Sequence, residues 1–344
     1  MKHHLTGAFV LAAIAAPLAA QAEGKIYGQF NISVNEVDGS FATVDGNDFA
    51  GASQPQDGQS GDNNASRLGF QGENGQFFYA VELGLDVDVN GGSADDSADG
   101  LAHTRHAFVG FNSSVGTFTF GRTNTAYKLA AQRLDPFYDT SAVNFQGIAS
   151  NQGGGYGLSN LANGWTNNSI AYISPEFGGL TVNAGIYLQE QSDESHDYGI
   201  GVDYRLGDLS LGVQYLTVGA DNVDGVVAGS GLIVDTALQG TVSYSTERFS
   251  VGLSAEQVDL RAGDDRIYLF LGGEFALNEY LTLAASVGDV DQGGGEGMGF
   301  TVGAYLDLIE NFTLYGLYSQ SDLDNAPASE TDVISVGVRY GFEI

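Results

Sequence analysis

The sequence predicts an all-β fold, a transmembrane antiparallel 16-stranded β-barrel with one loop folded into its interior. Three observations point to it: runs of alternating apolar and polar residues, tight turns that alternate with long loops, and a stretch without periodicity at residues 123–165. The composition agrees, because 50 of the 344 residues are Gly and 16% are charged. Soluble domains have about 7% Gly and about 25% charged residues. Such a chain is made of strands and turns.

The alternation is clearest between residues 76 and 89, where one face carries large apolar side chains and the other carries Ala, Gly and acidic residues. Side chains of a strand point alternately to its two faces. Sixteen runs of this kind follow one another, centred near residues 30, 68, 82, 108, 119, 171, 184, 201, 213, 240, 253, 270, 284, 302, 315 and 338. Each run has about ten residues, the length with which a tilted strand crosses a bilayer.

The connections between these runs also alternate. One set is tight and includes Asn74-Gly75, Gly207-Asp208 and Glu310-Asn311. The other set is long and rich in Asp, Gly, Ser and Asn, at residues 36–62, 90–102, 123–165, 191–196, 220–234, 260–264, 289–297 and 321–331. Short turns at one end and long loops at the other are typical of outer-membrane barrels. An even strand number places both termini at the short-turn end.

A soluble β-sandwich or β-solenoid would also alternate. A membrane barrel is favoured because one face of each run carries Leu, Val, Ile and aromatic residues from end to end. The opposite face carries Gly, Ser, Thr, Asn and single charges. Aromatic residues also stand at the ends of many runs, where a membrane interface would hold them. In hydrocarbon every backbone polar group needs a partner, and a closed barrel provides all of them.

The first 22 residues have the features of a secretory signal peptide. Lys2 precedes an apolar core from Leu5 to Leu18, and Ala20-Gln21-Ala22 is a small-x-small cleavage site. The barrel domain is therefore expected at residues 23–344. The chain has no Cys, so no disulfide is available to stabilise it outside the cytoplasm. A formal net charge of −31 excludes nucleic acid as a partner held through phosphate contacts.

Several motifs resemble those of the general diffusion porins of Gram-negative outer membranes. They are Arg67–Glu73, Arg105–Gly110 followed by Gly116–Arg122, and Asn168–Leu180. The resemblance covers residues 23–344 and implies a 16-stranded barrel, usually a homotrimer, set in outer-membrane lipid and lipopolysaccharide. It implies passive diffusion of small hydrophilic solutes and ions. No enzyme activity and no cofactor are expected, because the sequence contains neither a Gly-x-Ser-x-Gly elbow nor a Walker loop. One departure is that Glu343 and Ile344 follow the terminal aromatic Phe342, which makes the last strand longer.

Residues 123–165 are expected to form the constriction loop of this pore. Acidic and basic side chains on facing walls create a transverse field that selects ions. The candidates are Arg67, Glu82 and Arg105 on the wall, and Lys128, Arg133, Asp135 and Asp139 on the loop. Strand parity points Arg67 into the lumen, whereas both faces of the run at 103–111 are apolar and leave Arg105 undecided. Turn formation around Pro136 is an equally good explanation of either single acid.

Two further hypotheses concern the loop and its base. Residues 126–132 could form one or two helical turns. Arg122 has the parity of Phe118 and Phe120, so it points either outward to a subunit contact, with Asp95, Asp96 or Asp99 of a neighbour as partner, or inward to the base of the loop. No metal site is expected, because His103 and His106 lie three apart on a strand and so on opposite faces.

The pore is expected to prefer cations, because acids with lumen parity outnumber the wall arginines; these acids are Glu82, Asp86, Asp203, Glu256 and Asp307. An acidic surface suited to a salty habitat would have the same composition. Two alternatives remain open. One is a channel selective for sugars or for a particular anion, and the other is an exported adhesin or enzyme on a β-scaffold.

Overall fold

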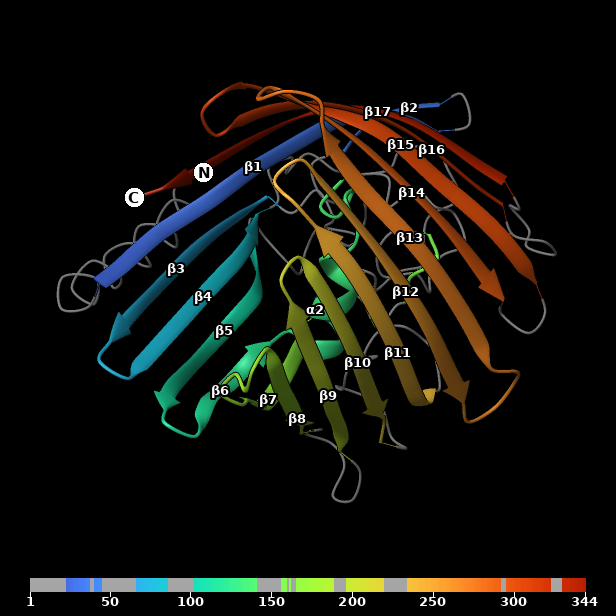
Figure 1. Cartoon of the computed structure of the whole chain (residues 1–344). Coiled ribbons are helices and arrows are strands. Elements are labelled where there is room, and N and C mark those ends of the chain that lie inside the picture. The colour runs from blue at the N-terminus through green and yellow to red at the C-terminus, as the bar shows by residue number, and fades with distance from the viewer. Residues whose placement is uncertain are drawn as a thin grey trace, which may run out of the picture.

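The computed structural model describes residues 23–37, 40–44, 66–85, 102–140, 156–159, 161, 165–188, 196–219, 234–291, 295–322 and 330–344. These residues form one antiparallel barrel with a short helix, α2, in its interior (Figure 1). The strands are β1 Glu23–Val37, β2 Ser40–Val44, β3 Arg67–Asn74, β4 Phe77–Leu85, β5 Ala102–Ser113, β6 Gly116–Thr123, β7 Thr166–Ile173, β8 Leu180–Tyr187, β9 Asp197–Leu206, β10 Leu209–Thr217, β11 Val234–Ser245, β12 Phe249–Leu260, β13 Arg266–Ala276, β14 Leu281–Asp291, β15 Glu296–Ile309, β16 Phe312–Asp322 and β17 Glu330–Glu343.

The sheet closes on itself, since β1 pairs with β17 from Tyr27↔Glu343 onward. On its other edge β1 pairs with β2 and β3 in succession, at Ser33↔Val44 and at Glu23↔Glu73. These two segments therefore share one position, and the described strands fill sixteen positions around the barrel. Closure removes the free sheet edge that a membrane would not tolerate. The predicted 16-stranded antiparallel barrel is confirmed.

All sixteen predicted runs fall within a strand, and the differences lie in the connections. Ser40–Val44 was expected within a long loop but forms β2, which prolongs the hairpin with β1. At the other end of the chain, the N–H of Ile26 donates to the carbonyl of Ile344, and the N–H of Ile344 donates back. The two residues beyond Phe342 thus extend the β1–β17 ladder, as their parity predicts.

The two faces of the sheet have opposite chemistry. Along β12, Leu253 is 45% exposed on the outer face, whereas Ser254 and Glu256 on the inner face are almost completely buried. Leu, Val, Ile and Phe side chains are exposed in this way all round the barrel. Exposing so much apolar surface is unfavourable in water and favourable in hydrocarbon. Exposed aromatic residues lie near the short turns at Phe77, Phe249, Phe275, Tyr280 and Tyr340, as expected of an interfacial girdle.

Tight turns connect the strands at one end of the barrel. Gly75 and Gly207 each begin a two-residue turn with positive φ, 63° and 59°, a conformation that Gly adopts without a steric cost. Asn311 occupies the same region at 64°, which Asn tolerates better than most residues. The long connections lie partly outside the described residues, as do the predicted signal peptide at 1–22 and Asp86, Asp95 and Asp96. Within the part of the chain that is described, no helix has the length and apolar character to cross a membrane.

Candidate functional site

The segment after β6 packs against the inner wall of the barrel. Helix α2, Ala126–Gln132, begins at Thr125, whose side-chain oxygen accepts a hydrogen bond from the N–H of Lys128 at 3.0 Å. This contact satisfies one of the free N–H groups of the first turn. The helix lies against β8–β11. The helical turns expected at 126–132 are therefore present.

Hydrogen bonds to a buried carboxylate attach this segment to β12. The hydroxyl of Tyr127 donates to Glu256 Oε2 at 3.1 Å, and the N–H of Ser159 donates to Glu256 Oε1 at 3.4 Å. Burial beside Glu256 raises the pKa of Tyr127 well above its usual value, so that its hydroxyl stays protonated and donates. Glu256, expected as a lumen charge, is sealed behind the loop with an exposed fraction of 2%.

Glycines on the inner wall provide the space for this packing. Leu134 sits on Gly252 and Gly272, and Tyr156 sits on Gly288 and Gly299. A Cβ at Gly288 would lie 1.7 Å from the carbonyl oxygen of Tyr156. The loop backbone thus approaches the sheet more closely than any side chain would permit.

A β-bulge turns Arg105 toward the lumen. Glu82 pairs with His106, whereas Leu83 pairs with Thr104, so Arg105 is the extra residue of β5. Strand parity alone would place Arg105 opposite to His106. The bulge instead aims its guanidinium at Glu82, with Nε 2.8 Å from Oε1. The side chains of Arg105 and Glu82 are 6% and 9% exposed.

The loop joins this cluster through Asp139. Arg67 Nη1 lies 2.9 Å from Asp139 Oδ2 and its Nε lies 3.9 Å from Glu82 Oε2, a carboxylate oxygen that also accepts from the hydroxyl of Tyr27 at 2.8 Å. Asn31 Nδ2 donates to the carbonyl of Asp139 at 2.6 Å. Asp139 has a φ of 64°, so these contacts hold it in an uncommon backbone conformation. The structure therefore brings Arg67, Arg105, Glu82 and Asp139 together.

Lys128 reaches the same cluster from α2, which lies inside the barrel and is not a membrane-spanning segment. Its Nζ lies 4.3 Å from the ring centre of Trp165, and the guanidinium carbon of Arg105 lies 4.4 Å from that centre. An indole face attracts both cations. Burial, reinforced by the charge of Arg105, lowers the pKa of Lys128 to about 7. Its charge therefore changes near neutral pH.

Arg133 and Asp135 lie elsewhere, toward β9–β13. Arg133 Nη2 lies 2.9 Å from Asp203 Oδ1, while Asp203 Oδ2 accepts from Asn183 at 3.1 Å and from Gln214 at 3.2 Å. Asp135 Oδ1 accepts from the N–H of Phe137 at 2.9 Å. Asp135 therefore has the turn-forming contact that was one of its two explanations.

Arg122 is paired with Ala107 of β5, on the face of the sheet that also carries the exposed Val109 and Phe120. Its Nε donates to the carbonyl of Thr104 at 3.0 Å and its Nη1 donates to Asn167 Oδ1 at 2.5 Å. These contacts lie on β5 and just beside the bulge at Asn168 in β7. The expected partners of Arg122 in a neighbouring subunit, Asp95 and Asp96, lie outside the described residues.

Several residues of the site were missed in the sequence. Trp165, Arg205 and Arg339 lie at or near the charged lumen, and Arg339 Nη2 approaches the carbonyl of Asp139 at 3.5 Å. Parity was an available signal for Arg205 and Arg339, which share the inner faces of Asp203 and Gly337. Trp165 offered no such signal, because it is the last residue of the loop and belongs to no strand. Across the described ranges, no group of three His, Asp or Glu side chains could hold a metal ion.

Solved structures with the same fold include porins and outer-membrane proteins. An anion-selective porin from Comamonas acidovorans is 19% identical, with a TM-score of 0.70 over 93% of this chain and 100% of that one. The trimer form of OmpT, an outer-membrane protein of Vibrio cholerae, is 15% identical, with a TM-score of 0.62 over 93% and 99%. A mutant of Rh. blastica porin is 19% identical, with a TM-score of 0.61 over 93% and 100%.

The family comparison covers almost the whole chain. No curated protein sequence matched it, and at these identities the solved structures show the fold alone. The family model described as Gram-negative porin, however, matches residues 7–343. Family and fold both indicate a channel rather than an enzyme, and they place it in the outer membrane. With its closed barrel and charged interior, this chain belongs to the family of Gram-negative porins.

Proposed function

We propose that the mature chain, residues 23–344, forms a water-filled pore for passive diffusion of small hydrophilic solutes and ions, after removal of residues 1–22 as a signal peptide. The observation that carries this proposal is the packing of residues 126–140 on the inner wall. They approach β9 through Arg133, β12 and β13 through Leu134, and β3 through Asp139. A segment held in this way narrows the lumen but does not block the pore.

The constriction consists, in this proposal, of the charged residues expected from the sequence. Arg67, Arg105 and Glu82 belong to the wall, and Lys128, Arg133, Asp135 and Asp139 belong to the loop. Their ion pairs lie inside a narrow space where charges interact more strongly than in bulk water. The field across this space would order water and slow solutes whose dipole cannot align with it.

The expected cation preference is replaced here by a weak preference that is tilted toward anions. Of the five acids on which it rested, Glu82 and Asp203 are paired with arginines and Glu256 is sealed behind the loop. Arg205 is exposed in the lumen, and the side chain of Arg133 is 46% exposed. Acids on distant loops contribute little, because charges more than about 10 Å apart are screened at 0.1 M salt.

Planar-bilayer recordings test both parts of this proposal. Discrete conductance steps that are linear in salt would support an open pore, and their absence with protein shown to be folded would reject it. Under a KCl gradient we expect a reversal potential close to zero, with the sign of the Nernst potential of Cl⁻. A reversal potential close to the Nernst potential of K⁺ would restore the cation preference.

A homotrimer in lipid with lipopolysaccharide is the proposed assembly. The support is that one solved structure with this fold is titled a trimer form. Light scattering of the detergent-solubilised protein gives its mass once the detergent mass is subtracted. The full chain has a mass of 36.0 kDa, and we expect three times the mass that remains after removal of the signal peptide. A mass of one chain would reject the trimer while leaving the pore intact.

A further inference from the structure

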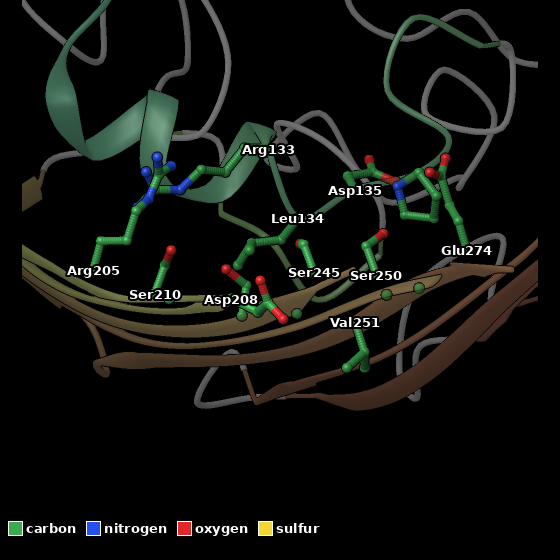
Figure 2. A pocket seen from close by; sticks show the side chains of 16 residues that line it. Arg133, Leu134, Asp135, Arg205, Asp208, Ser210, Ser245, Ser250, Val251 and Glu274 are labelled. Atoms are coloured by element: carbon green, nitrogen blue, oxygen red, sulfur yellow. The ribbon is translucent and has the colours of Figure 1, made fainter. Parts of the chain in front are cut away.

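A pocket of about 360 Å³ lies between the loop and the inner wall, close to the short turns. Residues 133–136 form its upper side, and residues from the facing ends of β9 to β13 form its floor (Figure 2). It is separate from the cluster of Arg67, Glu82 and Arg105, which belongs to β3, β4 and β5. None of the proposed constriction charges on the wall lines this pocket.

One end of the pocket is positive. The guanidinium groups of Arg133 and Arg205 converge there, although one comes from the end of α2 and the other from the end of β9 (Figure 2). Arg133 forms an ion pair with Asp203 through its Nη2. Because a guanidinium has five N–H donors in a planar fork, both arginines keep donors for a carboxylate.

The other end is negative. The side chains of Asp135 and Glu274 line this end, away from the two arginines (Figure 2). Asp135 Oδ1 accepts the N–H of Phe137, while the half-buried Glu274 stands opposite Ser250 in the register of β12 and β13. A cationic group at this end would therefore meet two carboxylates.

Hydroxyl groups and bare backbone connect the two ends. The floor carries four serines and four glycines, together with Asp208 of the turn. Serine hydroxyls both donate and accept hydrogen bonds, and glycine leaves the peptide groups accessible. The floor suits a short polar chain such as a peptide backbone.

We propose that this pocket is a subsite for small zwitterions such as amino acids and dipeptides. The solute carboxylate lies at Arg133 and Arg205, and its ammonium group lies toward Asp135 and Glu274. An anion would leave the acidic end unmatched, a cation would leave the arginines unmatched, and a neutral sugar would leave both. This proposal rests on the proposed function, since the solute reaches the pocket through the pore.

Three probes of similar size separate these possibilities in planar-bilayer recordings of the purified protein at pH 7. Diglycine is a zwitterion, N-acetylglycine an anion and glycinamide a cation. At equal concentrations we expect diglycine to interrupt the ion current or raise its noise, with clearly smaller effects from the other two. An equal or greater effect of N-acetylglycine would replace the proposal with a simple anion site. No effect of any probe on an open channel would reject the subsite and leave the porin function standing.

Variants at both ends of the pocket provide a second test of the proposal. Arg205→Gln and Glu274→Gln should each raise the dissociation constant for diglycine about two- to fivefold, as expected for one partly screened charge pair. Arg248→Gln and Glu279→Gln, on exposed short turns outside the pocket, are the matched controls and should leave it unchanged. If diglycine binding survives both pocket variants, the assignment is wrong. The comparison of the three probes on the unmodified protein decides the matter even where a variant does not fold.

Discussion

Glu82 is the residue whose charge organises the wall cluster. Its carboxylate lies 2.8 Å from Arg105, 3.9 Å from Arg67 and 2.8 Å from the Tyr27 hydroxyl. Glu82→Gln would leave two arginines without their shared carboxylate. Breaking a buried ion pair costs about 3–5 kcal/mol, so the temperature at which the folded band disappears in a heat-modifiability gel should fall markedly.

The control for this variant is Glu343→Gln. The Lys25–Glu343 pair is as short, 2.7 Å, but its side chains are more than half exposed. An exposed pair contributes about 0–1 kcal/mol, so this variant should melt close to the unmodified protein. Equal melting of the two variants would mean that Glu82 does not hold the cluster together.

Lys128 provides a pH dependence with a definite sign. With a pKa of about 7, its ammonium group is charged at pH 6 and neutral at pH 8. Arg105, Arg122, Glu82 and Asp139 are the charged groups that act on it. The reversal potential should therefore move toward the cation side as the pH rises, with a midpoint near 7.

The corresponding variant is Lys128→Met, whose unbranched side chain is one atom shorter and carries no charge. It should show the high-pH selectivity of the unmodified protein at both pH values. His106→Gln is the control, because His106 is a neighbouring titratable group. A pH shift that persists in Lys128→Met but disappears in His106→Gln would assign the titration to the histidine.

At the scale of elements, the loop and the strands fit together through glycine. Gly288→Ala would place a methyl group 1.7 Å from the carbonyl oxygen of Tyr156, so the loop must move away from β14. Overpacking of this kind costs about 1–3 kcal/mol. We expect a lower melting temperature and a changed single-channel conductance.

Gly240→Ala is the matched control, because nothing lies within 4 Å of the Cβ it would add on β11. This variant should keep both conductance and melting temperature. If Gly288→Ala also conducts like the unmodified protein, the position of the loop does not set the width of the pore.

At the scale of the whole molecule, stability depends on which solvent each face meets. Leu271 lies at the middle of β13 with its side chain exposed on the outer face. Arg on the lipid face of a barrel costs about 2–4 kcal/mol at the midplane and about 0–1 kcal/mol near an interface. Leu271→Arg should therefore lower the urea midpoint of folding into liposomes far more than Tyr280→Arg, at a short turn. Equal effects would mean that Leu271 does not lie near the midplane of the bilayer.

Local patterns were sufficient to predict the strands, because each face of a barrel strand meets a different solvent and every second residue records that difference. They predicted the position of every long strand and the inner face of Arg67. They left the orientation of Arg105 undecided, because a bulge reverses the parity there and no residue type indicates a bulge. They also counted Glu256 as a pore charge, since parity places a side chain on a face without saying what covers that face.

The sequence by itself determined that the chain is a membrane β-barrel with a polar interior, because alternation and turn residues act over a few positions along the chain. Only the tertiary structure decided which charges neutralise one another. Asp139 meets Arg67 and Arg133 meets Asp203 across 72 and 70 residues of sequence. Such pairings depend on the path of the loop across the lumen. That path is set by packing of the loop on inner-wall glycines, which belong to strands far away in the sequence.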